Sequence, residues 1–345
     1  MYKLNFTGDP YKAGYKYGLL SYKRNIRIKD ILDFSEEIYS LDKDVMAIYK
    51  EYYPEVLEEI KGISEGQKLS YKSLAGYILS STPSSLGDKS FCFAMIDRNN
   101  IILGRNCNLE TTSNEIHKSC FYNLHGGYSF IGNTYSLVQM GDGINEWGLS
   151  VGLSPIASKA SKPGLNGGMV VRYLLEKCRN TYEAVEMLKK LPIAYKIGLI
   201  IVDGAGDCIL AEISGDKVSV RSTDNNSPFL LSANIFNNQP MRKYRSRGAE
   251  ALIMQNRYLE LEKILKNSDG YVQDLPFNFL LEAQDFMEDF VKDKSYKTLW
   301  SAIYDLKNFK IYRTEGKSIK NNYKQDFRFN GLHNSTKLYK YNEKL

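Results

Sequence analysis

The sequence predicts an α+β fold in which antiparallel sheets are covered by helices and preceded by a helical N-terminal segment. In the first eighty or so positions apolar residues recur at helical spacing, and from Ser90 onward the pattern changes to short β-prone runs. The later strands come in blocks with pairs of helices between them, which argues against the strict βαβ alternation of a parallel sheet. No repeat or linker interrupts the pattern, so we expect one layered domain over residues 90–345 with a helical segment, residues 1–89, packed on it.

The N-terminal segment contains three predicted helices. Helical periodicity covers residues 11–23, directly behind Gly8-Asp9-Pro10, and residues 45–66, where apolar and acidic residues alternate at three- and four-residue steps. A third helix is expected over residues 70–80, with Ser70 as its N-cap.

The layered part opens with a predicted hairpin. Residues 91–96 and 101–105 are β-prone and flank Asp97-Arg98-Asn99-Asn100, where Asn and Asp tolerate the left-handed turn conformation. The other predicted strands cover residues 135–140, 148–153, 197–202, 208–213, 218–222, 299–305 and 310–314. The other predicted helices cover residues 168–177, 181–190, 247–265 and 277–291.

Composition and charge restrict the class of protein. With 43% hydrophobic and 25% charged residues the chain is typical of a globular protein with a substantial core. The net charge of +6 is small, and we interpret its one basic run, residues 241–247, as a solvated loop or helix start, so no nucleic-acid partner is expected. We also expect no membrane contact and a cytoplasmic location, because the chain lacks a signal peptide and an apolar stretch of membrane length.

Five cysteines and three histidines offer little conventional chemistry. The cysteines form no CxxC pair, so neither a zinc site nor a disulfide scaffold is indicated, and we expect no metal and no cofactor. His117, His125 and His333 are the only candidate bases for a Ser-His-Asp hydrolase. Ser150 lies in a GxSxG pattern, but the residues after it continue as a strand, whereas a nucleophile elbow needs a helix there. A serine esterase with Ser150 as its nucleophile remains an alternative function.

The hairpin that starts at Ser90 carries a second kind of nucleophile. Side chains alternate along a strand, so the Ser90 hydroxyl and the Cys92 thiol point to the same face. The return strand can bring Arg105 across the ladder, where its cation would lower the pKa of a thiol.

Six segments of the chain match, in order, the motifs of one known family. They are Gly8, Gly14 and Gly18 of the first helix, Tyr53 to Gly66 (similar to P-E-x-x-x-E-I-x-G-x-A-E-G), the hairpin with Gly104-Arg105-Asn106 (G-(R/Q)-N), Gly143 to Leu149 (G-x-N-E-x-G-L), the helix pair around Val171 to Glu176 and Thr181 to Ala184, and Ser232 to Phe236 (T-N-H-F). The chain therefore resembles the acyl-CoA:6-aminopenicillanic-acid acyltransferase-like proteins, N-terminal-nucleophile hydrolases related to choloylglycine hydrolases and acid ceramidases.

This resemblance implies a four-layer αββα sandwich, with the N-terminal helical segment as a propeptide or α-chain. It implies that the chain cuts itself before the nucleophile and that the freed α-amine then serves as the general base, so no histidine is needed. The expected reaction is hydrolysis or transfer at a linear amide bond through an acyl-enzyme. The expected partner is a small-molecule amide or acyl substrate, and a homo-oligomer fits this class.

The resemblance also implies roles for five polar residues. Asn234 would donate its side-chain amide to the oxyanion, and Arg105 would orient or stabilise the nucleophile. Asn145 would hold the amine or the substrate, and Asn106 and Asn108 would contact the substrate.

Two departures from the family pattern leave the nucleophile open. The motif register places it three residues before Phe93, at Ser90, where the family has cysteine, whereas Cys92 is the neighbouring thiol on the same face. Asn108 stands where the family's G-x-N-x-D pattern has an aspartate. Both Ser90 and Cys92 are therefore candidate nucleophiles, and a family member that is not processed and acts as a binding or scaffolding protein is the alternative function.

Overall fold

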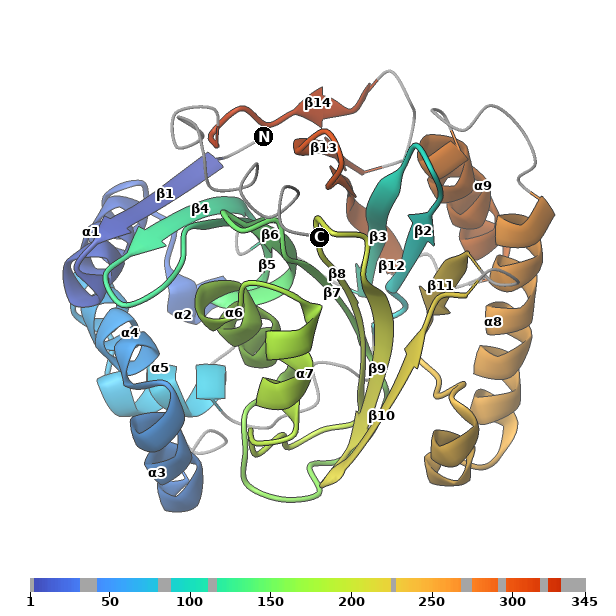
Figure 1. Ribbon diagram of the computed structural model, residues 1–345. Helices are drawn as coiled ribbons and strands as arrows, with labels where there is room; N and C mark the ends of the chain where they lie inside the picture. Colours follow the sequence, from blue (N-terminus) through green and yellow to red (C-terminus); the bar gives the residue numbers. More distant parts are fainter. Residues whose placement is uncertain are drawn as a thin grey trace.

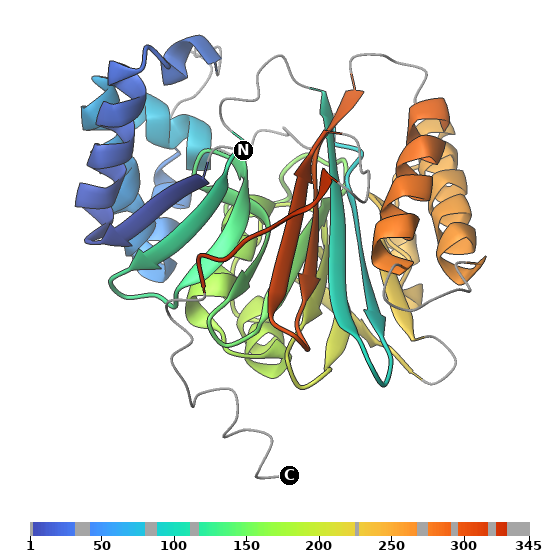
Figure 2. The ribbon, with the colours of Figure 1, turned by 90° about the horizontal axis from the view of Figure 1, so that it is seen from above.

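Helices and sheets stack in four layers in the computed structural model, with a group of helices on each outer side of two sheets (Figure 1). It describes residues 3–31, 42–79, 88–110, 117–224, 228–267, 275–290, 296–316 and 322–329. The view from above separates the blue and green helices on one side from the orange helices on the other (Figure 2). This arrangement confirms the predicted α+β class and the αββα sandwich.

The larger sheet has the order β1-β4-β5-β6-β7-β8-β9-β10. Its strands are β1 (Lys3–Gly8), β4 (Ser119–Leu124), β5 (Phe130–Ser136), β6 (Gln139–Asn145), β7 (Ser150–Pro155), β8 (Ile197–Val202), β9 (Cys208–Ser214) and β10 (Lys217–Ser222). Neighbouring strands are antiparallel except β1 and β4, which pair in parallel.

The smaller sheet has the order β11-β2-β3-β12-β13-β14. Its strands are β11 (Phe229–Ser232), β2 (Phe91–Ile96), β3 (Ile101–Glu110), β12 (Tyr296–Asp305), β13 (Lys310–Glu315) and β14 (Lys324–Gln325). The predicted hairpin is confirmed: β2 pairs with β3, and the Asp97 carboxylate accepts the backbone N–H groups of Asn99 and Asn100 at 2.6 and 2.9 Å.

The helices cover the outer faces of the two sheets. Beside the larger sheet lie α1 (Pro10–Lys23), α2 (Ile28–Ile31), α3 (Lys43–Tyr52), α4 (Pro54–Gln67), α5 (Tyr71–Leu79), α6 (Gly167–Lys177) and α7 (Thr181–Leu188). A 3₁₀ turn, η2 (Gln239–Tyr244), leads to α8 (Ala249–Asn267) and α9 (Leu275–Phe290), which pack on the smaller sheet. Between the two sheets lies a separate apolar core that contains Cys92, Ala94 and Leu103.

The N-terminal segment is bound to the rest of the fold by a strand that the sequence did not predict. Strand β1 joins the edge of the larger sheet, and α1 then begins at Pro10 behind the N-cap Asp9. Helices α1 and α4 touch backbone to backbone, since a Cβ on Gly62 would lie 2.1 Å from the carbonyl oxygen of Tyr11. The domain boundary at residue 89/90 stays a prediction.

Two predicted elements were wrong. The single helix over residues 45–66 is divided into α3 and α4, because Tyr53 leaves the helical conformation (φ −147°, ψ 56°) immediately before Pro54. The single strand predicted over residues 135–140 is instead the end of β5 and the start of β6, joined by a tight turn in which Leu137 has a φ of 51°. Within the described ranges, no helix is long and apolar enough to cross a bilayer.

Candidate active site

The start of β2 brings the Lys89–Ser90 peptide to the junction of both sheets and α8. Ser90 is fully buried and faces the space between the sheets, on the same side of β2 as Cys92. Phe91 and Phe93 face the opposite way, toward Phe279 of α9. The alternation predicted for residues 90 and 92 is therefore confirmed.

Polar groups from several elements contact this one peptide bond. The carbonyl oxygen of Lys89 accepts hydrogen bonds from the guanidinium of Arg257 and, at 3.4 Å, from the side-chain amide of Asn108. The backbone N–H of Ser90 donates to a carboxylate oxygen of Asp88 at 2.5 Å, and the Ser90 hydroxyl accepts the backbone N–H of Asn108 at 3.1 Å. The carbonyl oxygen, the nitrogen and the adjacent hydroxyl each have a defined partner.

Asn108 is oriented for this contact by the next strand. Thr298 of β12 donates its hydroxyl to the side-chain oxygen of Asn108 at 2.7 Å, which turns the amide NH₂ toward Lys89. The backbone of Asn108 also accepts the N–H of Lys89 at 2.9 Å. Asn108 is thus part of the predicted site, and here its donor faces a backbone carbonyl.

Arg257 is the residue that the sequence did not reveal. It is fully buried, and burial lowers the pKa of its guanidinium to about 10, against the opposing effect of the Asp88 carboxylate. Along α8 it lies on an apolar face with Tyr258, Leu261 and Leu265. An arginine at apolar helical spacing was the signal available in the sequence.

Asn234 follows the edge strand β11 and is the link between Arg257 and the larger sheet. Its φ of 57° is a left-handed conformation that Asn tolerates, and it turns the chain back beside Lys89. Its side-chain oxygen accepts a hydrogen bond from Arg257, while its amide donates to the carbonyl of Pro155 at 2.7 Å. In the intact chain Asn234 therefore orients Arg257, the group that reaches the carbonyl oxygen.

Cys92 has a different environment from Ser90. Its thiol donates to the carbonyl of Gly152 at 3.4 Å, and a Cβ on Gly152 would lie only 3.2 Å from that of Cys92, so the two sheets are in close contact here. Arg105 lies directly across the ladder, as expected. The expected net lowering of the thiol pKa was wrong, because burial raises the pKa of Cys92 to about 12 and outweighs the opposing effect of Arg105.

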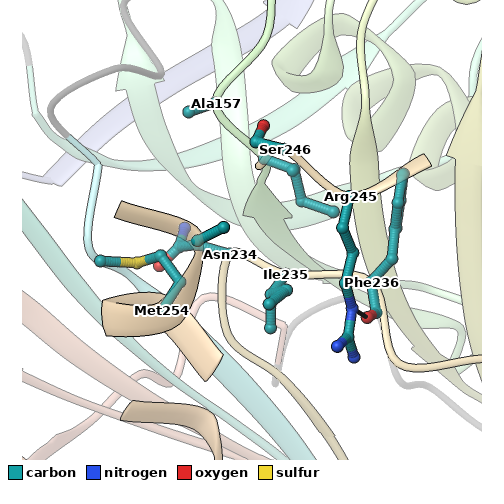
Figure 3. A pocket seen from close by; sticks show the side chains of 9 residues that line it. Ala157, Asn234, Ile235, Phe236, Arg245, Ser246 and Met254 are labelled. Atoms are coloured by element: carbon teal, nitrogen blue, oxygen red, sulfur yellow. Dashed lines mark hydrogen bonds between the residues drawn. The ribbon is translucent and has the colours of Figure 1, made fainter. Parts of the chain in front are cut away.

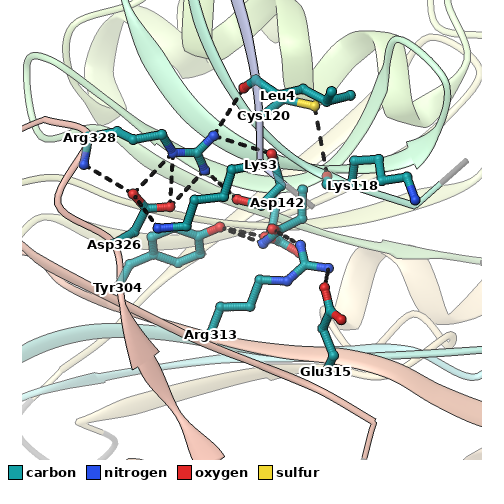
Figure 4. A network of polar contacts seen from close by, with 12 residues as sticks. Lys3, Leu4, Lys118, Cys120, Asp142, Tyr304, Arg313, Glu315, Asp326 and Arg328 are labelled. Carbon is teal, nitrogen blue, oxygen red and sulfur yellow. Dashed lines mark hydrogen bonds and ion pairs between the residues drawn. The ribbon is translucent and has the colours of Figure 1, made fainter. Parts of the chain in front are cut away.

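Arg105 belongs to a buried polar network between the sheets. It donates to the carbonyl of Leu153 at 2.9 Å and to the Asp142 carboxylate at 3.2 Å. Asp142 also accepts the Trp300 indole N–H at 3.0 Å and the hydroxyl of Tyr304 at 2.5 Å, as seen for Tyr304 in Figure 4. These contacts fix the arginine on the face that Ser90 and Cys92 share.

Two predicted site residues, Asn106 and Asn145, are not brought to this bond. The Asn106 side chain faces α9, where it donates to the Leu280 carbonyl at 3.3 Å. Asn145 holds its own turn and the end of α6, donating to the carbonyls of Leu175 and Cys178 and accepting two backbone N–H groups. The geometry therefore does not support their predicted substrate contacts.

The nucleophile-elbow alternative does not fit the structure. Ser150 begins strand β7, which continues to Pro155, so the helix that an elbow requires is absent from these described residues. The hydroxyl of Ser150 donates to the carbonyl of Gly143 at 2.8 Å. The serine is a buried strand residue.

A pocket lies beside the site (Figure 3). Its volume is about 380 Å³ with the open mouth included, and Asn234 forms part of its wall. The other lining residues are mostly apolar, among them Ile156, Ile235, Phe236 and Met254. Arg257, which donates to the Lys89 carbonyl, also donates to Asn234, and Asn234 lines this mostly apolar pocket.

A family model with the description acyl-coenzyme A:6-aminopenicillanic acid acyl-transferase matches residues 96–320, which is more than half of the chain. The chain belongs to this acyltransferase family. Its members are N-terminal-nucleophile amidohydrolases and acyltransferases, as the motifs predicted. The matched segment begins at Ile96, which follows both Ser90 and Cys92 in the sequence, so the family assignment does not identify the nucleophile.

Solved structures of three enzymes are similar to this member of the acyltransferase family. Penicillin V acylase from Agrobacterium tumefaciens is 14% identical, with 66% of this chain and 82% of that chain covered and a TM-score of 0.44. The Caenorhabditis elegans orthologue of N-acylethanolamine-hydrolyzing acid amidase is 16% identical, with 63% of this chain and 93% of that chain covered and a TM-score of 0.47. A conjugated bile acid hydrolase from Clostridium perfringens is 13% identical, with 68% of this chain and 92% of that chain covered and a TM-score of 0.45. The search of curated protein sequences found no match.

Proposed function

We propose that this chain is a precursor that cuts itself between Lys89 and Ser90 and then acts, through Ser90, as an amidohydrolase or acyltransferase on a linear amide. One observation carries the proposal. The carbonyl oxygen of Lys89 contacts a buried cation, Arg257, and a side-chain amide, Asn108, while a hydroxyl stands on the residue that follows.

The first reaction would be an acyl shift from nitrogen to oxygen. The Ser90 hydroxyl oxygen attacks the carbonyl carbon of Lys89, and negative charge develops on the carbonyl oxygen, where Arg257 and Asn108 donate. The hydroxyl proton passes to the Ser90 nitrogen, the C–N bond breaks, and an ester joins Lys89 to Ser90. Water then hydrolyses the ester, which leaves a carboxylate on Lys89 and a free hydroxyl and amine on Ser90.

The second reaction would use the amine that the first one makes. An α-amine has an ordinary pKa of about 7.7–8.0, so near neutral pH a useful fraction can accept the hydroxyl proton of the same residue. Attack on a substrate amide gives an acyl-enzyme on Ser90 and releases the amine product. Water as the acceptor completes hydrolysis, and an amine acceptor completes transfer.

The contacts support Ser90 over Cys92 as the nucleophile. The peptide before Cys92 lies inside the paired strand β2, and the Cys92 thiol, with a pKa raised to about 12, is neutral at physiological pH. The peptide before Ser90 precedes the strand and has the Arg257 cation on its carbonyl oxygen. A hydroxyl is a weaker nucleophile than a thiolate, so we expect slow processing.

The apolar pocket supports a substrate with an apolar group next to its amide. Asn234 connects the pocket wall to Arg257, so an amide carbonyl at Arg257 would direct one substituent along Ile235 and Met254. In the intact chain Ser90 is fully buried, which fits a precursor that becomes active only after the peptide bond before Ser90 is cut.

The intact mass of the purified chain tests this function. We expect two fragments whose masses sum to that of the 39.4 kDa chain plus one water, with Ser90→Ala remaining whole. The processed protein should then be covalently labelled on Ser90 by an activated acyl ester. A wild-type chain that stays whole after prolonged incubation would indicate a binding or scaffolding protein instead of a self-processing enzyme.

A further inference from the structure

Among the described residues, the carboxylate of Asp88 touches the bond to be cut, and no motif assigns it a role. It is 3% exposed, and one of its oxygens accepts the backbone N–H of Ser90. Its other oxygen is buried and has no hydrogen-bond partner among the residues that the structure describes. A buried carboxylate with an unused oxygen is costly to fold unless it compensates nearby positive charge.

The surroundings of Asp88 contain cations from two elements. Its negative charge acts on Arg257 of α8 and on Arg105 of β3, and it also acts on the thiols of Cys92 and Cys107. The two arginines come from opposite sides, since α8 packs on the outer face of the smaller sheet and Arg105 faces the space between the sheets. The charge of Asp88 therefore favours the charged form of both arginines, the one on the Lys89 oxygen and the one on the face that Ser90 and Cys92 share.

The self-cleavage proposed above separates charge across one peptide bond. In the intermediate the Lys89 oxygen is negative, and the Ser90 nitrogen becomes positive when it takes the hydroxyl proton. Arg257 and Asn108 contact the oxygen, and Asp88 contacts the nitrogen. Each end of the charge-separated intermediate thus has a partner of opposite or complementary charge.

We infer that Asp88 is a catalytic residue of self-cleavage: its carboxylate stabilises the positive charge on the Ser90 nitrogen and then holds the new α-amine in the mature site. This inference rests on the proposed function and deepens it, because the mature site would contain residues from both fragments. Asn108 of β3 also contacts the Lys89–Ser90 bond, but its side chain is neutral and cannot stabilise the positive charge on the nitrogen.

The N-terminal fragment can stay in place after the cut. Strand β1 is hydrogen-bonded along β4, helices α1 and α4 pack in the core beside the larger sheet, and Asp88 itself forms a bridge with Leu109 of β3. These contacts do not depend on the Lys89–Ser90 bond. Asp88 would therefore remain next to the amine that cleavage creates.

A carboxylate exchange tests the inference. The fraction of cut chain is followed over time by intact mass for wild type, Asp88→Asn and Asp88→Glu. We expect Asp88→Asn to slow cleavage by about 10²-fold, which is typical for loss of one charge-stabilising group. We expect Asp88→Glu to regain most of the rate, because it returns a carboxylate to the nitrogen end of the same bond.

Matched measurements separate this role from a structural one. Asp216→Asn removes an exposed carboxylate and should cut like wild type, and circular dichroism and thermal unfolding show whether each variant is folded. If wild type is cut and a folded Asp88→Asn is cut equally fast, or if a folded Asp88→Glu does not regain the rate, the role of Asp88 alone is overturned. A wild-type chain that is never cut overturns the proposed function, and the inference with it.

Discussion

Replacing Arg257 by methionine should separate the chemistry of the site from the stability of the fold. Methionine keeps an unbranched apolar side chain, shorter than that of arginine, and removes the cation from the carbonyl oxygen of Lys89. Loss of one oxyanion donor costs about 3–4 kcal/mol of transition-state stabilisation, which is a rate decrease of about 10²–10³-fold. Self-cleavage should slow by that factor.

The effect on folding should be smaller. Burial lowers the pKa of Arg257 from 12.5 to about 10, which corresponds to an unfavourable term of about 3.5 kcal/mol for keeping the charge, at about 1.4 kcal/mol per pKa unit. The variant removes this term and loses the hydrogen bonds to Lys89 and Asn234, each worth about 1.5–3 kcal/mol, or about 3–6 kcal/mol together. The two contributions oppose each other, so we expect the free energy of unfolding to decrease by no more than about 3 kcal/mol.

The assay is the time course of intact mass for the purified variant beside urea unfolding. Arg221→Met, which removes a half-buried arginine of β10 that donates to the side-chain oxygen of Asn238 at 3.2 Å, serves as the control and should be cut at the wild-type rate. An Arg257→Met chain that is folded and cut as fast as wild type would refute the assignment of Arg257 to the oxyanion.

Three further predictions follow from the same contacts. Ser90→Cys should be cut faster than wild type, because a thiol is the better nucleophile, and unchanged or slower cleavage by intact mass would contradict this. The Cys92 thiol, with a pKa raised to about 12, should resist alkylation in the folded chain at pH 8, and mass spectrometry that finds rapid labelling would disprove its burial. Gly62→Ala would place a Cβ 2.1 Å from the backbone of Tyr11 and should lower the free energy of unfolding by about 2 kcal/mol or more, measured in urea.

Elements fixed by local chemistry were predicted well from the sequence. The β2–β3 hairpin depends on the Asp97 side chain, which bonds its own turn, and α1 depends on the Asp9 cap and Pro10, so neighbouring residues determine both. Strand β1 was missed because its stabilising partner is β4, more than a hundred residues later. The turn at Leu137 was missed because its two central residues, Leu137 and Val138, are buried and apolar and are not typical of turns.

The candidate site divides in the same way. Ser90, Arg105 and Asn234 could be proposed from the sequence because they lie in segments with recognisable motifs, and their catalytic roles stay predictions. Arg257 and Asp88 lie in no motif, and their roles arise from contacts that only the folded chain creates: Arg257 reaches Lys89 across 168 residues of sequence. A motif suggested Asn145 as a site residue, but its side-chain amide bonds the backbone of its own turn and of the end of α6.

The identity of the new N-terminal residue is the most direct test of the central claim. After the purified chain has been incubated, the large fragment is isolated and its first residue is determined by terminal sequencing and tandem mass spectrometry. The contacts of the Lys89–Ser90 bond predict a fragment that begins at Ser90. A fragment that begins at Cys92, or a chain that remains whole, would contradict the account.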